Sequence, residues 1–522
     1  MGQKPGPPAR ARARIDGSRA PEPDGLTDRQ LRRDLNAAEN AELARLYDNG
    51  TISQATRQQL QRSLDLEAAR LSEQHQGSLT LEVASSVTSH LRADGPPAAA
   101  RVLCGPVSAR AVSVVQVKVT AEAARRFLLA RHYLAPARSL TGGPESVMQV
   151  FRKFGSIQFD PVAVAGRNHD LVLHARVADY EPAWCDALYE RREIFEATNK
   201  ALSLVPASEF PWFRHVMGRK GPRFHGAALA ENAAVAQRVL ERIRAEGSLS
   251  ARDFEREAGP TKDWFGMPEN AVRAVLEAYT VTGAIGLARR DGNLRYYDLL
   301  ERLLPAEVLA HQVPEREQLR HKLLSRYRAH GLLGAGGAGG TFDRIAPPNS
   351  TPERPGRDAL RRELVELGAL VPVDVEGVRG KRFVLGEELA LLQAPPESAP
   401  SVAFIAPFDS LLWDNALVAS LFGFDYVWEG FFPPSKRRWG WYVLPITFGD
   451  RFVGRIEPRI DRDRARVDVL GLWWEDGFAP RADGFVDAMR DALRAYLRFA
   501  GAGRLEWAPH LATEQRIFLT RP

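Results

Sequence analysis

A helix followed at once by a pair of short strands recurs along this chain, and this order constrains the fold more than any other feature of the sequence. In the clearest copy, apolar residues at helical spacing run over 270–282, and Gly283 then ends the pattern. Two strands are predicted next, at 284–289 and 294–297, and Asp291-Gly292 between them is typical of a tight hairpin turn. A helix that leads into a hairpin is the order of elements in a winged helix-turn-helix.

Two further copies of this pattern flank the clearest one. The first has helices behind Thr120 and over 147–151, followed by an extended segment at Gln158. The elements predicted for the last copy are a helix and two strands, at 357–368, 370–375 and 382–385. A helix is also predicted to start within Leu249–Phe254, ahead of the central copy. Each copy alone fits a generic helix–hairpin module, but three in tandem favour DNA binding.

From Val402 onward the chain is predicted to be rich in strands that an amphipathic helix closes. The expected strands and helix lie at 439–446, 451–456, 467–472 and 480–500. The predicted fold class is therefore α+β: tandem winged helix-turn-helix domains, then a C-terminal β-rich domain, after a mostly disordered and helical N-terminal extension. The predicted boundaries are 1–26 (disordered), 27–72 (helical hairpin), 73–115 (linker), 116–235, 236–312 and 313–395 (winged helices one to three) and 396–522 (β-rich domain).

Two segments keep more than one interpretation. The charged hairpin at 27–72 is similar to the cytoplasmic tail of bacterial sodium/proton antiporters, which implies docking to a membrane protein, but a solvated helical appendage is the preferred interpretation. The Gly/Ala-rich segment at 331–340 is interpreted either as a loop that approaches the DNA backbone closely or as a plain linker.

Bulk properties exclude several classes of protein. The 522 residues carry a net charge of +6, which hints at nucleic acid as a partner, and no apolar run approaches the ~18 residues of a membrane span. Cys104 and Cys185 have no metal-ligand spacing and fit a reducing cytoplasm. Because no P-loop or dinucleotide fingerprint is present either, no metal and no cofactor are predicted.

One stretch of the β-rich region mixes basic and aromatic residues, as phosphate-contacting surfaces do. Over 435–466, Trp439 and Trp441 are interleaved with basic residues that outnumber the acidic ones, namely Lys436, Arg437, Arg438, Arg451, Arg455, Arg459, Arg462, Arg464 and Arg466. We expect Lys436, Arg437 and Arg438 to contact DNA, and a solvated sheet face is the alternative.

The most informative short motif is Ser156–Pro161. Ile157 and Phe159 alternate with Gln158 and Asp160, so an extended backbone places the amide and the carboxyl on one face, roughly 6–7 Å apart. Pro161 favours that backbone at Asp160. Such a pair can position a water molecule and accept its proton, while a short edge strand with two solvated polar residues is the alternative.

Several separated motifs resemble the YcaQ/AlkX/AlkZ family of bacterial DNA glycosylases. They are Gln158-Phe159-Asp160, Arg167–His174, Asp179-Tyr180, Phe195-Glu196-Ala197, Leu204-Val205-Pro206, Pro407–Asp414 and Phe422–Tyr426. The resemblance covers about 120–510 and implies winged-helix domains. The Gln-x-Asp form is similar to the branch that excises N7-alkylguanines and unhooks interstrand crosslinks.

This resemblance implies chemistry for the motif. Because an N7-alkylated guanine is cationic and already a good leaving group, the reaction needs a positioned water and a negative charge near the developing sugar cation. We expect Asp160 to activate the water and Gln158 to hold it. No lysine stands beside the motif, which favours a monofunctional hydrolase over a Schiff-base lyase.

Further site residues keep two interpretations each. Arg167, His169 and Asp170 are expected to contact DNA or the lesion or to buttress the catalytic pair, and the alternative is a structural polar cluster of His169 and Asp170 at the start of a strand. Asp409 and Trp413 are expected to line the lesion site, or to belong to the core. The predicted protein is a cytoplasmic, nucleoid-associated monomer that acts on alkylated or crosslinked double-stranded DNA. A non-catalytic winged-helix transcription regulator is the rival hypothesis.

Overall fold

A computed structural model describes most of the chain from Val117 onward, in one compact unit at Arg110–Pro522. The described residues are 117–214, 226–257, 260–262, 268–291, 294–336, 340–342, 345–351, 354–511 and 518. The predictions for 1–26, 27–72 and 73–115 lie outside this range. The predicted α+β class is confirmed, because the described residues form helices and five sheets.

The first helix–hairpin unit contains a three-stranded antiparallel sheet in the order β2-β4-β3. Its elements are β1 (Val117–Val119), α3 (Ala121–Arg131), α4 (Pro144–Phe154), β2 (Ile157–Gln158), α5 (Asn168–His174), α6 (Pro182–Glu190), β3 (Ile194–Thr198), β4 (Leu202–Pro206) and the 3-10 turn η1 (Ala207–Trp212). Thr120 caps α3 as predicted, since its hydroxyl accepts a hydrogen bond from the Ala123 amide.

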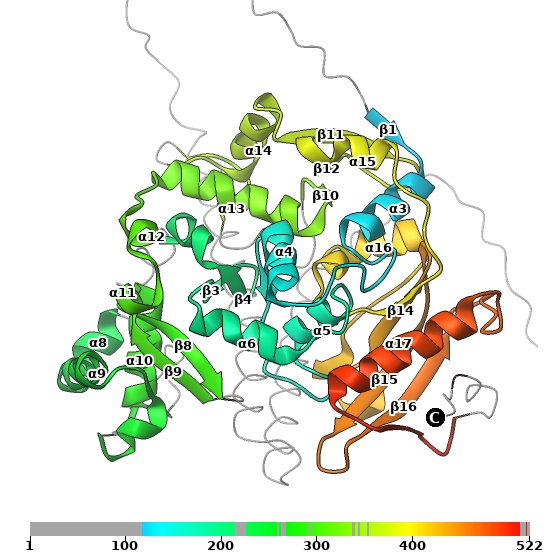
Figure 1. Cartoon of the computed structure of the whole chain (residues 1–522). Coiled ribbons are helices and arrows are strands. Elements are labelled where there is room, and N and C mark those ends of the chain that lie inside the picture. Colours follow the sequence, from blue (N-terminus) through cyan, green and yellow to red (C-terminus); the bar gives the residue numbers. More distant parts are fainter. Residues whose placement is uncertain are drawn as a thin grey trace, which may run out of the picture. The chain divides into compact units, whose positions relative to one another are not determined.

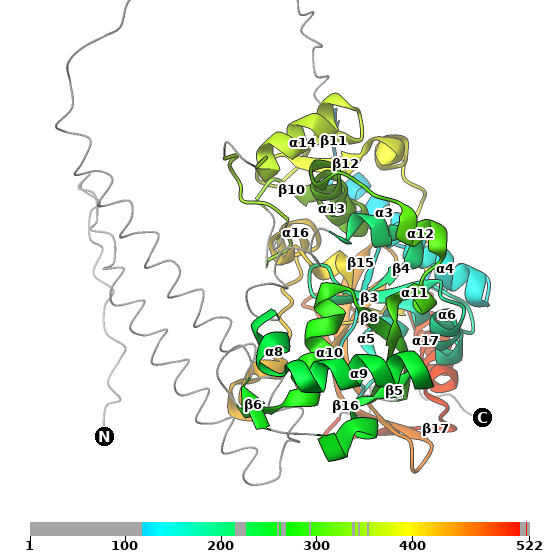
Figure 2. The same cartoon turned by 90° about the vertical axis from the view of Figure 1, so that its left-hand side faces the viewer.

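The second unit repeats this layout, with a sheet in the order β5-β9-β8. Its elements are α8 (Gly226–Glu231), α9 (Ala233–Glu246), β5 (Leu249–Ser250), η3 (Ala251–Glu257), β6 (Pro260–Lys262), β7 (Pro268–Asn270), α10 (Ala271–Thr282), β8 (Ile285–Asp291), β9 (Leu294–Leu299), α11 (Leu300–Leu303) and α12 (Ala306–Ala310). The predicted helix and both strands are confirmed: the Asn270 side chain caps α10, and Gly283 ends it with a φ of 80°. Figure 2 shows α9 and α10 packed side by side.

The helix predicted at Leu249–Phe254 is wrong. These residues form the short strand β5 and the start of a 3-10 turn, because Leu249 pairs with Tyr297 of β9 and the Asp253 carboxylate binds the Ser250 amide. The carboxylate therefore tightens the chain into a local turn instead of starting an α-helix.

The third unit has a four-stranded sheet in the order β1-β11-β12-β10. Its elements are α13 (Glu315–His330), β10 (Leu333–Gly334), α14 (Arg357–Glu366), β11 (Leu370–Val375), β12 (Arg382–Leu385), η4 (Gly386–Glu388) and α15 (Leu389–Gln393). Both predicted strands are confirmed residue for residue. Part of the Gly/Ala-rich segment is neither loop nor linker, because Leu333 pairs with Phe383 at the sheet edge. The first strand of the described chain, β1, pairs with β11, so the first and third units share one sheet.

The C-terminal region is β-rich as predicted, with a sheet in the order β13-β14-β15-β16-β17. Its elements are β13 (Val402–Phe404), η5 (Ser410–Leu412), α16 (Asn415–Phe422), η6 (Glu429–Phe431), η7 (Pro434–Lys436), β14 (Leu444–Phe448), β15 (Arg451–Asp461), β16 (Arg466–Trp474), α17 (Phe485–Ala500) and β17 (Arg504–Trp507). Helix α17 lies across the strands (Figure 1) and buries Phe485, Met489, Leu493 and Tyr496 against them.

The strand predicted at 439–446 begins only at Leu444, which corrects its first half. Backbone amides of Arg438, Trp439 and Gly440 bind the Glu429 carboxylate instead of a neighbouring strand, and those of Trp441 and Tyr442 bind Glu457. Two buried or half-buried carboxylates thus satisfy these donors in a loop. Among the described helices, none is long and apolar enough to cross a membrane.

Candidate active site

The Gln158–Asp160 motif lies at the end of a strand and not along it. Ile157 and Gln158 pair with Leu204 and Ser203 of β4, and the Phe159 amide still binds the Leu202 carbonyl at 2.8 Å. Asp160 is then the first residue beyond the ladder. The motif therefore starts extended, as the alternation predicts, but its carboxyl belongs to the turn that follows.

Asp160 is buried, which the spacing did not indicate. Its exposed fraction is 6%, whereas Gln158 is half-buried. One carboxylate oxygen accepts a hydrogen bond from the Val162 amide at 2.8 Å. Burial raises the pKa of Asp160 to about 6, although this hydrogen bond opposes the shift. A carboxyl that titrates near neutrality can exist as a base at physiological pH and still hold a proton with useful strength.

The turn behind Asp160 is held from the C-terminal region. The Val164 carbonyl accepts from the Ile460 amide of β15 at 2.8 Å, and the Ala165 carbonyl accepts from the Tyr496 hydroxyl of α17 at 2.5 Å. Gly166 has a φ of 113°, and a β-carbon there would lie 2.8 Å from the Phe499 ring. These contacts fix the path of the chain as it leaves the carboxyl.

Asn168 connects the motif to the Pro407–Asp414 run. Its amide nitrogen donates to the Gln158 carbonyl at 2.8 Å, and its amide oxygen accepts from the Phe408 backbone at 3.1 Å. Asn168 is fully buried. A single side chain thus ties β2 to the C-terminal region. Three of the motifs quoted for the family resemblance meet here, namely Gln158-Phe159-Asp160, Arg167–His174 and Pro407–Asp414.

Tyr442 is a further buried group near the carboxyl. Its side chain is 1% exposed, and its hydroxyl finds no hydrogen-bond partner within the described part of the chain. Burial raises the pKa of this hydroxyl well above its ordinary value, and the negative charge of Asp160 raises it further. The phenol is therefore neutral and lies within the field of the carboxylate.

Two of the other predicted site residues form a closed ionic cluster. Arg167 donates to Asp170 at 2.5 Å and to Asp186 at 2.8 Å, and Tyr180 donates to Asp170 at 2.7 Å. Burial alone would lower the pKa of Arg167, but the two carboxylates outweigh it and raise that pKa. This geometry matches the buttress interpretation better than a phosphate contact, because the guanidinium is already neutralised by two acids.

His169 packs against the motif instead of facing a ligand. Its ring stacks on Phe159 with centroids 5.3 Å apart. Burial lowers the pKa of His169 to about 4 despite the nearby Asp170 carboxylate, so the imidazole is neutral at pH 7. Its Nδ1 has no hydrogen-bond partner among the described residues.

Asp409 and Trp413 lie in the interior. Asp409 is fully buried and ion-paired with the fully buried Arg176 at 2.8 Å, and its other oxygen caps η5 through the Leu411 amide. Trp413 is 7% exposed, with the Lys200 ammonium 5.5 Å from its ring centroid. These contacts match the core interpretation of both residues.

Lys436, Arg437 and Arg438, here called the basic loop, lie together at the surface. Lys436 and Arg438 are exposed and Arg437 is half-buried. Arg438 stacks on Trp439 at 4.4 Å, and the Arg437 side chain donates to the Phe432 carbonyl. Two other basic residues of the same stretch make contacts within the protein. Arg455 is buried against Phe424, and Arg466 pairs with Asp468 and Glu506.

The chain matches a family of DNA glycosylases over most of the region that the structure describes. The model of the family described as "DNA glycosylase AlkZ-like" matches residues 151–499, about two thirds of the chain, which includes the whole site. The chain belongs to the AlkZ-like DNA glycosylase family. Among solved structures it is similar to the Streptomyces sahachiroi DNA glycosylase AlkZ, at 17% identity and a TM-score of 0.49, over 75% of this chain and 100% of that one.

Membership confirms the resemblance carried by the quoted motifs and makes DNA the substrate class of this glycosylase. Within the described residues, no three His, Cys, Asp or Glu side chains gather as ligands for a metal ion.

Four side chains in and around the candidate site were not predicted from the sequence. Asn168 lies inside a quoted motif, and its closeness to Asp160 in the sequence was a usable signal. Glu196 also stood inside one, but nothing in the sequence linked it to a partner. Arg290 and Tyr442 lie 130 and more residues from Asp160 along the chain, so only the fold brings them near.

Proposed function

We propose that this glycosylase is monofunctional and hydrolyses the N-glycosidic bond of N7-alkylated guanine, including guanines joined in an interstrand crosslink. Asp160 activates the attacking water, and Gln158 holds that water by its amide. The observation that carries the proposal is the buried carboxyl of Asp160, with its pKa raised to about 6, two residues after Gln158 in a DNA glycosylase family member.

The reaction balances without a cofactor. The bond between C1′ of the sugar and N9 of the base breaks, and its electron pair neutralises the cationic alkylguanine, which leaves as a neutral base. The water oxygen bonds to C1′, and its proton passes to the Asp160 carboxylate. Before that transfer, the same negative charge stabilises the positive charge that develops on the sugar.

The other predicted residues and domains have roles around this centre. The helix–hairpin units act as winged helices on duplex DNA, and the basic loop contacts phosphates beside the lesion. Arg167, His169 and Asp170 buttress the motif, while Asp409 and Trp413 support it from the interior. We further propose a monomer located in the cytoplasm with the nucleoid.

The test is base release from duplex DNA with a single N7-methylguanine, and from duplex DNA with an N7-linked interstrand crosslink. Wild type is compared with Asp160→Asn, which keeps the shape of the side chain but removes its charge and basicity. Release by wild type and its loss in the variant, at equal DNA affinity, supports the proposal. Tight DNA binding without release by either protein overturns it and leaves the winged-helix regulator.

A further inference from the structure

The hairpin of the second unit reaches the catalytic motif of the first. Arg290 stands in β8, and its guanidinium carbon lies 3.9 Å from the ring centroid of Phe159. Phe159 is the residue between Gln158 and Asp160, and His169 stacks on the same ring. Strands β3 and β8 are in contact, so this approach belongs to the packing of the two units.

A second layer of contacts fixes the orientation of Arg290. Its guanidinium donates two hydrogen bonds to the Glu196 carboxylate of β3, at 2.6 and 2.8 Å, and both side chains are 7% exposed. The Tyr189 hydroxyl also donates to Glu196, at 2.8 Å. A two-pronged pair of this kind sets the plane of the guanidinium as well as its distance.

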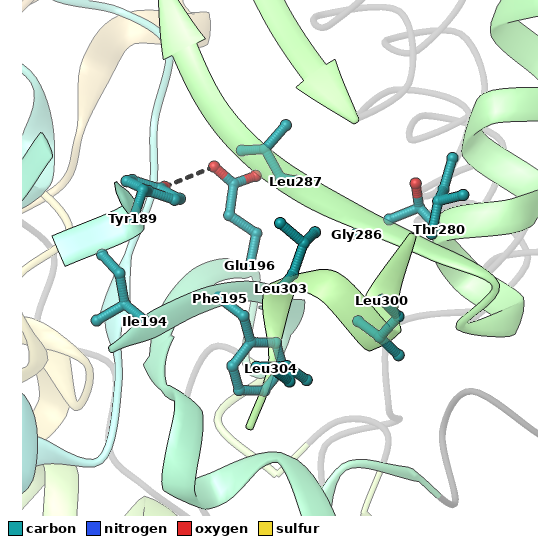
Figure 3. A pocket seen from close by; sticks show the side chains of 11 residues that line it. Tyr189, Ile194, Phe195, Glu196, Thr280, Gly286, Leu287, Leu300, Leu303 and Leu304 are labelled. Carbon is teal, nitrogen blue, oxygen red and sulfur yellow. Dashed lines mark hydrogen bonds between the residues drawn. The ribbon is translucent and has the colours of Figure 1, made fainter. Parts of the chain in front are cut away.

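The Glu196 carboxylate that anchors Arg290 lies where the two units are in contact, and Figure 3 shows its surroundings. Glu196 and Tyr189 meet at one end of a cleft, and Leu287 of β8 lies beside them. Apolar side chains of both units line the rest of the cleft, among them Phe195 and Leu304. The ionic anchor is therefore seated in an apolar contact, where water competes poorly for its hydrogen bonds.

Arg290 acts on the motif through packing and not through its charge. The raised pKa of Asp160 follows from burial, with the Val162 amide opposing it, and the Glu196 carboxylate neutralises the guanidinium locally. What Arg290 supplies is a rigid wall against Phe159, so that the residues on each side of this ring keep one arrangement. Misplacing reacting groups by about 1 Å costs on the order of 100-fold in rate.

We propose that Arg290 is a positioning residue for the Gln158–Asp160 pair, held by Glu196 and acting through Phe159. The β8–β9 hairpin is then part of the active site as well as a wing. The inference rests on the proposed base-release activity, and it names no contact of Arg290 with DNA.

The experiment measures single-turnover base release from N7-methylguanine duplex at saturating enzyme, together with DNA affinity. Arg290→Met is expected to lower the rate constant at least tenfold while the dissociation constant for DNA changes less than about twofold. The acid-side midpoint of its pH profile stays at the wild-type value. Arg494→Met is the matched control: Arg494 is exposed on α17 and ion-paired with Asp491, and the rate constant of this variant at saturation stays within twofold.

A double variant separates positioning from loss of folding. Arg290→Met strands a buried carboxylate, whereas Glu196→Gln combined with it removes both charges. We expect the double variant to unfold close to the wild-type temperature and to release base as slowly as Arg290→Met. A wild-type rate in the folded double variant overturns the inference, as does a rate loss that only follows the folded fraction. Wild type that releases no base overturns the proposed function itself.

Discussion

Two three-stranded sheets of the protein are built alike, yet the carboxylates that follow them have opposite character. In each, a short strand pairs with the second strand of a hairpin: β2 with β4, and β5 with β9. Asp160 comes two residues after the end of β2, and Asp253 comes three residues after the end of β5. Asp160 is buried with a raised pKa, whereas Asp253 is exposed with a lowered one.

Hydrogen bonding and cover account for the difference. Asp253 accepts from the Ser250 amide at 2.7 Å and from the Ser250 hydroxyl at 2.8 Å, and these bonds favour its charged form. Asp160 accepts only the Val162 amide among the described residues, and Tyr442 of the C-terminal region lies near its carboxyl. The same arrangement of strands is thus followed by an exposed carboxylate that caps a turn in the second unit, and by a buried carboxyl with a raised pKa in the first.

The largest expected difference between the two carboxylates is in the rate of base release. Asp160→Asn should lower the rate of base release by about 10²–10⁴-fold, the range lost with a general base. Asp253→Asn should leave that rate within twofold. Single-turnover assays on N7-methylguanine duplex measure both. Equal losses in the two variants would mean that Asp160 is structural.

Stability should change in opposite directions. A folded-state pKa raised from 3.8 to about 6 means that Asp160 favours the folded state at low pH, and that this stability is lost as the pH rises through about 6. Asp160→Asn should therefore stabilise the protein at pH 8, by on the order of 3 kcal/mol at most, and give no gain at pH 3.5.

Asp253→Asn should instead destabilise it at pH 8. Its pKa is lowered in the folded state, so its contribution is present above the unfolded value and is lost as the pH falls. Weakening such a cap costs about 1 kcal/mol or less. Denaturant unfolding of both variants at the two pH values checks the signs, and a destabilised Asp160→Asn protein at pH 8 would contradict the buried-charge account.

The pH dependence of base release sharpens the comparison further. Because the base must be deprotonated, the rate should rise with pH through an apparent pKa of about 6 and then level off. At pH 5 the rate should be about tenfold below the plateau. The profile of Asp253→Asn should keep this midpoint. A midpoint near 4 in wild type would show that Asp160 is solvated in the working enzyme.

The smallest effect concerns binding outside both sheets. Replacing Lys436 and Arg438 together with Ala should weaken DNA affinity several-fold and make it less dependent on salt, because fewer phosphates are neutralised. The rate constant at saturating enzyme should not change. Arg490→Ala and Arg494→Ala on the outer face of α17 form the control pair, since each lies within reach of an acid on its own helix.

Local sequence determined much of this protein. Helix α10 and its end at Gly283 were predicted from periodicity, and strands β11 and β12 were predicted residue for residue. The motif around Asp160 and the resemblance to DNA glycosylases were legible for the same reason, since residue types at short spacing carry them. The start of β14 and the turn after β5 were mispredicted, because Glu429 and Asp253 capture backbone amides there.

Tertiary structure alone decided which polar residues are buried. Alternation placed Gln158 and Asp160 on one face but could not show that Tyr442 lies near the carboxyl, that Tyr496 holds the following turn, or that Arg290 packs on Phe159. A pKa depends on every group packed around the acid, and those groups come from segments hundreds of residues apart. The sequence specified the carboxyl, and the burial that tertiary packing imposes on it raised its pKa to about 6.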